Sequence, residues 1–553
     1  MSQHSVLVVG GGPSGLITAL ALLKNGIHVR IIEKRESPHG GIRGTGITPR
    51  TLEIFASLGV LDDVLAPSTL VGRMAIHGAG KVIDKEMAFS ESAADSPTIP
   101  YRHPINLSQP ALETALRSGL TKNGVNVEYG VELIGIEQEE QGEYVLAKVK
   151  VEGKEVEEKF SYIISADGGR GTTRKILGIN FLGETPGEIL FTANIECEDL
   201  DRELWHMWGD IKASEKGCFM KPAEPAPLYQ FIAGGDLDRP LPTDTEGIQA
   251  MFNSITKSTD ITLQNASWIS EWRANIRMVD KFSVGRVFLV GECAHCHSPA
   301  GGQGINTAAM DALNVAWKVA LVHKGLASSS LLSSYESERL PVVAQMLKYT
   351  TKLHNETFHD GSLEEAMHRP REGHQLGVNY RWSSIVLDGR TPEVAGSTEP
   401  VEKDPYGMLG DKIRAGDRAP DATQINIVGK GGALGEATRL FGLTGDCTKH
   451  HVLLFGGYSA ATVQDAQSAL NPYSQAGVAS LVVILRSGAD IPTQLVDGVE
   501  YVRDDGGHAY RAYDVGEFDP LFVVVRPDGM IGAFAVSVEQ LEKYFSKFLS
   551  VLA

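Results

Sequence analysis

The chain has 553 residues, of which 42% are hydrophobic, so it is long enough to form several domains with substantial cores. Its formal net charge of −18 argues against partners that need a basic surface, such as nucleic acid or an anionic membrane. No run of 18 apolar residues predicts a membrane span, and the N-terminus does not resemble a secretory signal. Five cysteines, a sparse and odd number, are typical of free thiols in a reducing compartment, so we expect a cytoplasmic protein.

The first predicted elements are a buried strand, a glycine-rich turn and a helix. Residues 5–9, SVLVV, have the composition of a parallel strand and lead into GGGPSG, which fits G-x-G-x-x-G. A helical segment ends near Gly26, and a second strand, IHVRIIE, ends at Glu33. This order predicts a dinucleotide site, because the N-terminus of such a helix offers unpaired N–H groups to a pyrophosphate.

Each residue of this motif has a physical task. One glycine makes the tight turn, the next lets the backbone approach the pyrophosphate, and the last lets the helix pack on the strand. Glu33 is placed to accept hydrogen bonds from a ribose hydroxyl. The alternative is an ordinary glycine-rich strand–helix turn, which the surrounding pattern disfavours. The motif residues predicted to bind the cofactor are Gly10, Gly12, Pro13, Ser14 and Gly15.

Two further motifs follow along the chain. An alternating strand at 144–151 and its return strand lead into SYIISADGGRGTTR, where Asp167 and Gly168 come directly after a strand. Later, the strand GRVFLVG leads into GECAHCHSPAGGQGIN, which contains a glycine-rich turn, and then into a helix expected to begin near Thr307.

These motifs, in this order, resemble those of the single-component FAD-dependent aromatic hydroxylases, the group A flavoprotein monooxygenases. HSPAGGQGINTAAMDALN is most similar to the phenol-hydroxylase branch, which has an additional C-terminal domain. The resemblance implies an α/β fold: a Rossmann-like FAD-binding domain with an inserted β-sheet substrate domain, and a C-terminal thioredoxin-like α/β domain. It also implies FAD as the cofactor, NAD(P)H as a transient reductant, O2 as the oxidant and a small aromatic substrate.

The resemblance assigns roles to residues beyond the first motif. Glu33 and Lys34 would hold the adenosine ribose, and Arg43 and Gln109 would contact the FAD diphosphate or ribityl chain. Asp167 would brace the region where FAD and the reductant meet.

The third motif would contact the flavin ring and the ribityl chain. The segment 302–306 would offer backbone N–H groups to the pyrimidine edge of the flavin, where a positive helix end suits an anionic reduced flavin. The family usually has Asp after Gly291, whereas this chain has Glu292, which keeps the carboxylate but is one methylene longer. The predicted cofactor-binding residues of this motif are Gly291, Glu292, Gly302, Gly304, Ile305 and Asn306.

Four potential metal ligands, Cys293, His295, Cys296 and His297, are crowded into the same motif. A zinc site would need a second pair of converging ligands, and a redox C-x-x-C would normally open a helix after a thioredoxin-type strand. Neither pattern is complete in the sequence. We therefore expect a wall beside the flavin, with Pro299 at its close surface, and no bound metal.

Residues 181–280 are expected to form the substrate sheet. Phe219 and Tyr229 are pocket candidates, together with Pro299, although sheet core is the favoured interpretation for any single aromatic residue there. Phenol hydroxylases usually carry a carboxylate base where this chain has Thr45, and a neutral hydroxyl does not act as that base. The catalytic base therefore stays unassigned.

The expected division of the chain has four parts: an FAD-binding domain at 1–180 and 281–350, a substrate sheet at 181–280 with part of 70–110, a helical segment and linker at 351–410, and a thioredoxin-like domain at 411–553. Where a thioredoxin has C-x-x-C this last part reads YSAAT, so we expect packing or dimer contacts from it and no disulfide chemistry.

The predicted function is hydroxylation of a phenolic or other electron-rich aromatic compound through a flavin C4a-hydroperoxide, as the resemblance implies. Oxidative decarboxylation of a hydroxybenzoate, which uses the same flavin, and a flavin-binding protein without turnover remain alternatives. A flavin halogenase is disfavoured, because the Trp-x-Trp-x-Ile-Pro motif is missing from the sequence.

Overall fold

A mostly parallel sheet lies at the centre of the N-terminal half of this computed structural model. The residues that the structure describes are 5–71, 73–90, 92–139, 142–212, 215–362, 371–390, 404–407, 412–429, 433–456, 459–492, 494–516 and 519–550. Most of the expected linker within 351–410 falls outside these ranges. The strand order of the sheet is β20 (Ser283–Val284), β21 (Val287–Leu289), β12 (Tyr162–Ser165), β1 (Val6–Val9), β2 (Val29–Glu33) and β8 (Glu128–Tyr129).

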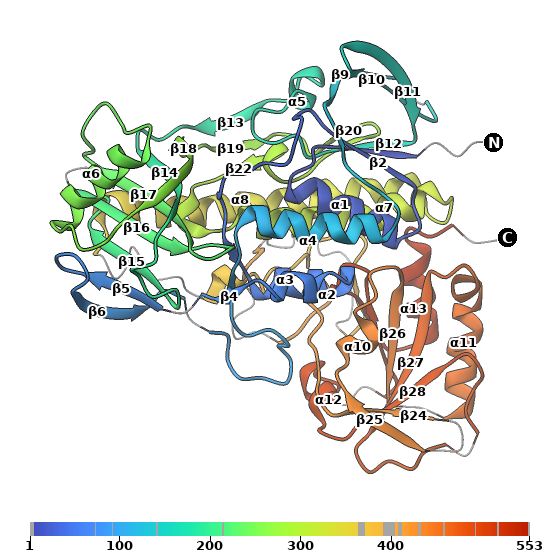
Figure 1. Ribbon diagram of the computed structural model, residues 1–553. Coiled ribbons are helices and arrows are strands. Elements are labelled where there is room, and N and C mark those ends of the chain that lie inside the picture. The colour runs from blue at the N-terminus through green and yellow to red at the C-terminus, as the bar shows by residue number, and fades with distance from the viewer. Residues whose placement is uncertain are drawn as a thin grey trace.

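Helices from distant parts of the sequence cover this sheet. α1 (Pro13–Lys24) packs against α7 (Gly304–His323) and against α4 (Gln109–Lys122), as Figure 1 shows. α7 begins at Gly304, three residues before the predicted start, because Gln303 is already its N-cap residue after the left-handed turn at Gly302. Almost every residue of α7 is buried, so this helix is part of the core.

The remaining N-terminal elements connect these layers. The further helices are α2 (Pro49–Leu58), α3 (Leu61–Leu65), α5 (Thr173–Ile176), α8 (Ser333–Asn355) and the short turns η1 (Gly291–Cys293), η2 (Pro299–Gly301), η3 (Ser329–Leu332), η4 (Glu356–Asp360) and η5 (Arg371–His374). An antiparallel sheet contains β9 (Val131–Gln138), β10 (Val145–Val151) and β11 (Lys154–Phe160). Two small sheets contain β13 (Phe181–Glu184), β19 (Ile276–Val279) and β22 (His295–Cys296), and β3 (Gly46–Ile47), β7 (Ile105–Asn106) and β4 (Thr69–Leu70).

A seven-stranded sheet lies at the far end of the molecule from the C-terminal part (Figure 1). Two of its strands come from residues 73–88, well before the main segment of the sheet in sequence. α6 (Thr245–Thr256) packs on one face of it. The strand order is β18 (Gln264–Arg273), β14 (Ile189–Glu196), β17 (Leu228–Gly235), β16 (Lys216–Pro222), β15 (Leu204–Gly209), β5 (Arg73–His77) and β6 (Ile83–Ala88).

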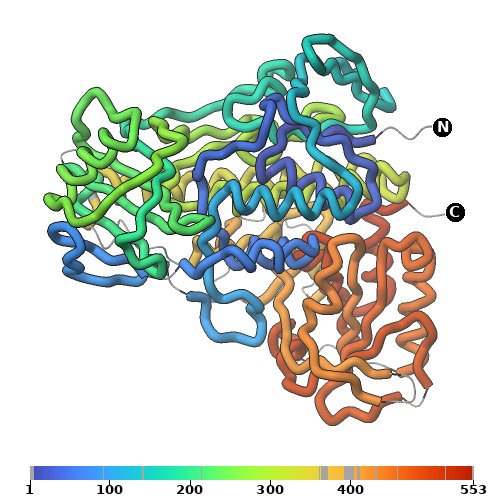
Figure 2. The backbone as a smooth tube through the Cα atoms, viewed as in Figure 1, coloured from blue at the N-terminus to red at the C-terminus, as the bar shows by residue number. Residues whose placement is uncertain are grey.

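The C-terminal segment forms its own eight-stranded sheet, which Figure 2 shows in orange and red at one side of the molecule. Its helices are α10 (Phe441–Thr444), α11 (Ala460–Gln475), α12 (His508–Ala512) and α13 (Val538–Ser546). The strand order is β23 (Leu387–Asp388), β30 (Ile531–Ala535), β29 (Leu521–Val525), β26 (His450–Phe455), β27 (Ala479–Arg486), β28 (Glu500–Asp504), β24 (Ile425–Val428) and β25 (Leu434–Thr438).

A buried ionic network joins the C-terminal sheet to the N-terminal half. Arg526 donates two hydrogen bonds, of 2.8 and 2.9 Å, to Glu338 of α8, and Lys318 of α7 lies 2.7 Å from the same carboxylate. All three side chains are completely buried. Because one buried charge without its partner is strongly unfavourable, this network fixes how the two parts pack.

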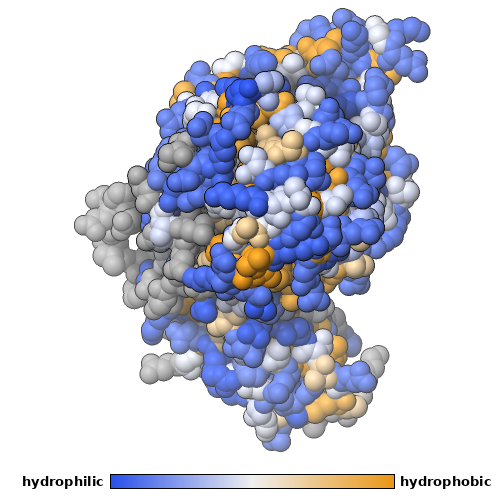
Figure 3. Space-filling view, turned by 60° about the vertical axis from the view of Figure 1, so that its left-hand side comes forward, coloured by the Kyte–Doolittle hydropathy of each residue, from blue (hydrophilic) through white to orange (hydrophobic). Residues whose placement is uncertain are grey.

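The architecture is a mixed α/β fold with several sheets and a C-terminal domain, which confirms these general features of the prediction. Among the described residues, no helix combines the length and the hydropathy needed to cross a membrane. The face in Figure 3 is mainly hydrophilic, with small separate hydrophobic groups.

Candidate active site

The three sequence motifs meet at one edge of the central sheet. β1, β12 and β21 are parallel neighbours, so their carboxyl ends lie side by side. The backbone remains paired as the strands end: Ala166 N–H donates to the Val9 carbonyl at 2.7 Å, and Val290 N–H donates to the Ser165 carbonyl at 2.9 Å. In open α/β sheets, ligands bind outside the carboxyl ends of the strands, which makes this edge the candidate cofactor site.

The first glycine turn has the conformation that its sequence predicts. Gly10 has φ +114°, a region that favours glycine, and a side chain there would collide with the Ala166 carbonyl. A side-chain carbon at Gly15 would lie 1.9 Å from the Gly10 carbonyl oxygen, so α1 packs on the turn only because this residue has none. Beside Gly12, by contrast, no protein atom lies within 4 Å of such a carbon. The turn is therefore closely packed at Gly10 and Gly15 and open to a ligand at Gly12.

Glu33 lies at the end of β2 and contacts the glycine turn. Its Oε2 accepts a hydrogen bond from Gly11 N–H at 2.9 Å, and its Oε1 accepts from the backbone and side chain of Arg35 at 3.0 and 3.1 Å. Burial acts to raise the pKa of the Glu33 carboxyl, but the hydrogen bonds from Arg35 and Gly11 outweigh it and hold the pKa below its usual value. The group is thus a carboxylate at neutral pH.

Three further residues were predicted to contact the cofactor: Lys34 at the adenosine ribose, and Arg43 and Gln109 at the diphosphate or ribityl chain. Lys34 and Arg43 are exposed. Gln109 is the first residue of α4, and its amide Nε2 donates to Glu113 Oε1 at 2.9 Å. The structure therefore leaves the two cations accessible to a ligand, whereas the amide of Gln109 already has one protein partner.

Asp167 organises the turn that follows β12. Its Oδ2 accepts hydrogen bonds from both the backbone N–H and the hydroxyl of Thr173, each at 2.9 Å. Its Oδ1 is buried and has no hydrogen-bond partner within the described part of the chain. Arg174 then donates to the Cys293 carbonyl at 2.8 Å, which ties the second motif to the third.

The third motif is fixed from the opposite side by α7 and α8. Gly291 N–H donates to Asp311 Oδ2 at 3.1 Å, and Asp311 also pairs with His295 and Arg339, each at 2.7 Å. Burial acts to raise the pKa of Asp311, but the charges of Arg339 and His295 bring it down to about 2. Glu292 itself is exposed.

The start of α7 combines backbone N–H groups that lack a partner in the helix with the side chain of Asn306, which the protein holds firmly. Asn306 accepts hydrogen bonds from Thr48 N–H at 2.9 Å and from the Thr51 hydroxyl at 2.8 Å, and it donates to the carbonyls of Gly46 and Gly302. Its side chain is therefore fully occupied within the protein. Only backbone N–H groups of the first helical turn, which lack intrahelical acceptors, remain for a ligand.

The crowded cysteines and histidines have separate partners. Cys293 and Cys296 are buried free thiols, and burial raises the pKa of Cys296 to about 12. His295 pairs with Asp311, whereas His297 Nδ1 lies 2.9 Å from the Ser298 carbonyl. Burial lowers the pKa of His297 to about 4. These four side chains do not converge on a common point.

The two faces of the seven-stranded sheet have different surroundings. Tyr229 lies on the face covered by α6, is completely buried, and donates its hydroxyl proton to the Leu200 carbonyl at 3.0 Å. Tyr229 therefore packs between the sheet and α6, on the opposite face of the sheet from Phe219. Phe219 lies on the other face, in a cluster with Trp205 and Met207.

This second face of the sheet meets the chain segment that leaves β2. Gln230 Nε2 donates to the Ile42 carbonyl at 2.9 Å, and Asn194 Nδ2 donates to the Gly40 carbonyl at 3.1 Å. Strand alternation places both amides on the same face as Phe219. Pro299, an exposed residue of η2, packs with its turn against α8. The face of the seven-stranded sheet that carries Phe219, called the Phe219 face below, thus lies against the segment 40–42.

The residues at this edge fit FAD. The spaces beside Gly12 and Gly302 both lie where α1 and α7 begin and present unpaired N–H groups, as an anionic ligand requires. The unpartnered Asp167 Oδ1 and the ionised Glu33 carboxylate add acceptors for hydroxyl groups. Backbone donors for phosphates and acceptors for a sugar are the donor set of a dinucleotide site.

Several residues that build the site had no role in the sequence analysis. Asp311 is a charged residue inside the largely apolar helix α7, and a fully buried charge of this kind is nearly always paired. That pattern was a usable signal. Glu188, His354 and His359 also lie together, and their separation in sequence gave no signal of it.

Comparisons with known proteins agree with this geometry. Residues 3–350 match a family model described as an FAD binding domain, and residues 483–552 match the phenol hydroxylase C-terminal dimerisation domain. The chain is 33% identical over 435 residues to a flavin-dependent monooxygenase of Mycobacteroides abscessus, covering 77% of this chain and 85% of the relative. It is 29% identical over 434 residues to pentachlorophenol 4-monooxygenase of Sphingobium chlorophenolicum, covering 76% of each.

The fold is also that of solved structures in this group. A ternary complex of aklavinone-11 hydroxylase with FAD and aklavinone has a TM-score of 0.78 at 23% identity and covers 99% of this chain and 98% of that chain. The monooxygenase PieE in complex with FAD and substrate has a TM-score of 0.77 at 22% identity, with 98% of both chains covered. Because the FAD-binding match covers more than half of the chain, and the M. abscessus relative is more than 30% identical, the protein belongs to the FAD-dependent aromatic monooxygenases that carry a phenol hydroxylase-type C-terminal domain.

Proposed function

We propose that the substrate is a phenolic or other electron-rich aromatic compound that binds between the flavin-facing loops and the Phe219 face of the seven-stranded sheet. Relatives that match over most or much of this chain support the phenolic class: one acts on pentachlorophenol, and another is a 6-methylpretetramide 4-monooxygenase of Streptomyces rimosus. With FAD bound, the cofactor supplies the oxygen-transfer chemistry, and the protein binds, orients and desolvates the reactants.

The observation that carries this proposal is the composition of the Phe219 face. Apolar side chains lie there beside polar atoms that are buried without a hydrogen-bond partner among the described residues: Thr192 Oγ1 and Gln230 Oε1. A buried polar atom without a partner is unfavourable, so it favours a ligand that supplies one. A hydroxylated aromatic ring provides both the apolar surface and the donors.

The cofactor contacts follow from the same geometry. In this proposal the N–H groups at the start of α1 bind the FAD pyrophosphate beside Gly12, and Glu33 accepts from the adenosine ribose, with Lys34 next to it. Arg43, which is exposed, adds charge at the diphosphate, and Gln109 contributes if its amide exchanges Glu113 for the ligand.

The flavin end of the cofactor lies at the third motif in this proposal. The first turn of α7, from Gly302 through Gly304, Ile305 and Asn306, holds the pyrimidine edge by backbone N–H groups. Glu292 and Asp167 face the ribityl chain and the entry of the reductant. NAD(P)H fits a transient reductant, because the sequence has one G-x-G-x-x-G motif and that one is assigned to FAD.

Thr45 remains an unsuitable base in the structure. Its side chain is buried before β3, and a neutral hydroxyl does not remove a phenolic proton at neutral pH. We therefore propose that Thr45 shapes the site and does not act as its base.

We propose that the C-terminal domain is thioredoxin-like in topology but acts in packing and in a homodimer. Support for the topology comes from the order β26–α11–β27, with parallel strands, followed by β29–β30–α13, with antiparallel strands. Support for the dimer comes from the match to a dimerisation domain. The one cysteine of this domain, Cys447, is buried, and burial raises the pKa of its thiol to about 11.

The test is steady-state oxidation of NADH and of NADPH by the FAD-loaded protein, across a panel of phenols, hydroxybenzoates and polycyclic phenols. The proposal expects O2-dependent oxidation that a phenolic compound stimulates, and a product heavier by one oxygen atom with all carbons retained. A product that has lost CO2 would instead identify the decarboxylating alternative.

A further inference from the structure

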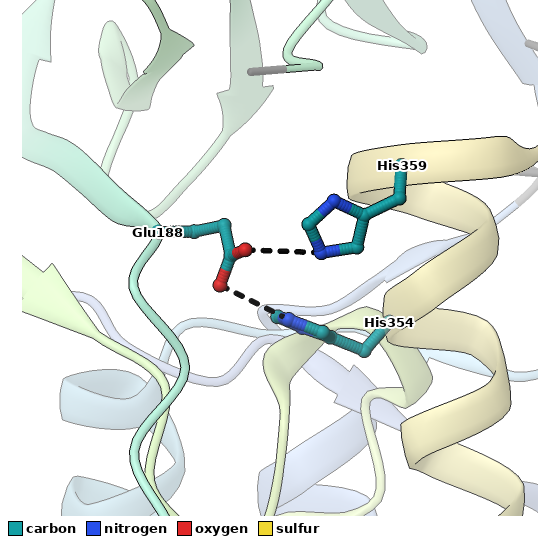
Figure 4. Close-up of side chains that lie close together, drawn as sticks. All are labelled: Glu188, His354 and His359. Atoms are coloured by element: carbon teal, nitrogen blue, oxygen red, sulfur yellow. Dashed lines mark hydrogen bonds and ion pairs between the residues drawn. The ribbon is translucent and has the colours of Figure 1, made fainter.

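One carboxylate and two imidazoles form a cluster outside the flavin-binding motifs. Glu188 immediately precedes β14, whereas His354 and His359 come from the end of α8 and from η4. His354 Nε2 lies 3.3 Å from Glu188 Oε2, and His359 Nε2 lies 3.0 Å from Glu188 Oε1. Figure 4 shows both rings turned toward the carboxylate, and the three donor atoms all lie within 4.8 Å of one another.

The shape of the helix end explains why histidines five residues apart meet. In a regular α-helix, residues three or four apart are neighbours, whereas residues five apart lie on different sides. The turn Glu356–Asp360 is π-helical, so its i→i+5 bonding widens the helix at this point. The ring centroids of His354 and His359 are 6.1 Å apart as a result.

The inner histidine is held by a hydrogen bond on its other nitrogen. Ser298 Oγ lies 2.9 Å from His354 Nδ1, and the same hydroxyl accepts from Ala300 N–H in η2. The His354 side chain is only 3% exposed. A neutral imidazole that donates Nδ1–H to a polar partner presents its Nε2 lone pair, which is the arrangement typical of metal-bound histidine.

We propose that Glu188, His354 and His359 bind a divalent transition metal ion of the zinc class. Imidazole and carboxylate ligands suit such an ion, and bonds of about 2.0–2.2 Å place the donor atoms roughly 3.3 Å apart. The distances from His354 Nε2 to Glu188 Oε2, 3.3 Å, and from His359 Nε2 to Glu188 Oε1, 3.0 Å, are of this size. Exposure rises from 3% at His354 to 20% at Glu188 and 42% at His359, which gives the ion an entry path and water for its open coordination positions.

The position of the site links it to the substrate face. Phe358, between the two histidines, packs in the same cluster as Phe219 and Trp205. A bound ion would connect the C-terminal end of α8, next to Phe358, to Glu188 at the start of β14. We infer that the metal fixes the rim of the Phe219 face. This site is separate from the cysteine and histidine cluster at 293–297, whose side chains do not converge.

The experiment is zinc titration of the FAD-loaded protein after removal of metal by a chelator. Calorimetry and elemental analysis are expected to find one Zn2+ per chain, with affinity that falls as pH falls because protonated imidazoles do not bind metal. Glu188→Gln and His359→Asn are expected to lose this ion, and Ser298→Ala to bind it about 10–100-fold more weakly. His28→Asn, which changes an exposed histidine elsewhere, is the matched control and should bind like the unaltered protein.

FAD content and melting temperature of each metal-free variant establish that it is folded. Zn2+ should raise the melting temperature of the unaltered protein and leave that of Glu188→Gln unchanged. Absence of stoichiometric zinc in the unaltered protein would overturn the proposal, leaving the cluster as a hydrogen-bonded network only. Equal zinc binding by Glu188→Gln and His359→Asn would overturn it as well. Neither result depends on turnover, so the metal site can be rejected without any consequence for the proposed substrate class, and the reverse is also true.

Discussion

The cofactor edge and the Phe219 face are built in different ways. At the cofactor edge, short loops directly after β1, β12 and β21 supply most of the chemistry through backbone N–H groups and a few fixed carboxylates. At the Phe219 face, single side chains from several strands contribute, with every second residue of a strand pointing the other way. Local sequence is therefore enough to predict the cofactor edge, whereas the Phe219 face also depends on which strands become neighbours.

This difference predicts how each region tolerates change. A site built from backbone groups loses its ligand when a single added methyl group keeps the ligand or a neighbouring segment from approaching the backbone. The backbone there has no alternative position. Side-chain sites lose contacts one at a time, and the loss scales with the surface removed. The following substitutions test that contrast, beginning with the largest effect.

Gly15→Ala should give the largest loss. The added methyl would lie 1.9 Å from the Gly10 carbonyl oxygen, so α1 and the glycine turn must separate. We expect a loss of about 1–3 kcal/mol in the free energy of unfolding, together with loss of FAD. Denaturant unfolding of the FAD-free protein measures the first effect, and an unchanged unfolding midpoint would contradict the packing described for this turn.

Gly12→Ala is the matched change on the open side of the same turn. No protein atom lies near the added methyl, so we expect normal folding. FAD should nevertheless be lost, because the methyl occupies space that the pyrophosphate needs. Flavin absorbance after gel filtration checks this, and retention of one FAD per chain would remove Gly12 from the cofactor site.

Arg43→Ala should weaken FAD binding without abolishing it. Removing one charge-assisted contact costs about 1.5–3 kcal/mol, or roughly tenfold to a hundredfold in affinity. Fluorescence titration of the FAD-free protein measures the dissociation constant. An affinity equal to that of the unaltered protein would show that this exposed arginine does not contact the cofactor.

Phe219→Ala and Tyr229→Phe compare the two faces of the substrate sheet. Phe219→Ala should raise KM for the aromatic substrate about tenfold by removing apolar contact surface. Tyr229→Phe should leave KM unchanged and lower stability by about 1 kcal/mol, because only its hydrogen bond to the Leu200 carbonyl is lost. If KM instead responded to the change at Tyr229 alone, the substrate would bind on the face covered by α6, and the proposed position at Phe219 would be wrong.

Replacing Cys293 and Cys296 together with Ala should have the smallest effect. Both thiols are buried and form no disulfide, and free cysteine behaves as a small apolar residue. FAD content and most of the turnover should persist, with only modest loss of stability. Reversible inactivation by oxidation, present in the unaltered protein and absent from the double variant, would show a redox role that this account excludes.

The sequence predicted the cofactor edge better than the rest of the molecule. Gly10 and Gly15 have the tight turn and the close helix packing expected of them, because a strand–turn–helix unit determines its own geometry. Which sheet face Phe219 and Tyr229 occupy could not be predicted, because both fit strand spacing and only strand pairing decides the face of each one.

Long-range side-chain contacts were the least predictable part. Asp311 pairs with His295 and Arg339 across three segments, and Glu188 meets His354 over 166 positions of sequence. No local pattern encodes such meetings. The start of α7 was predicted three residues late because the left-handed turn at Gly302 lets the helix begin directly after it.

The central claim is that this chain binds FAD and inserts an oxygen atom from O2 into an aromatic ring. The most direct test is turnover of the FAD-loaded protein with NAD(P)H and an active phenol from the panel under 18O2, followed by mass spectrometry of the product. The account predicts one 18O atom per product molecule and none when the label is supplied as water. An unlabelled product, or a purified protein that stays colourless after incubation with FAD, would contradict it.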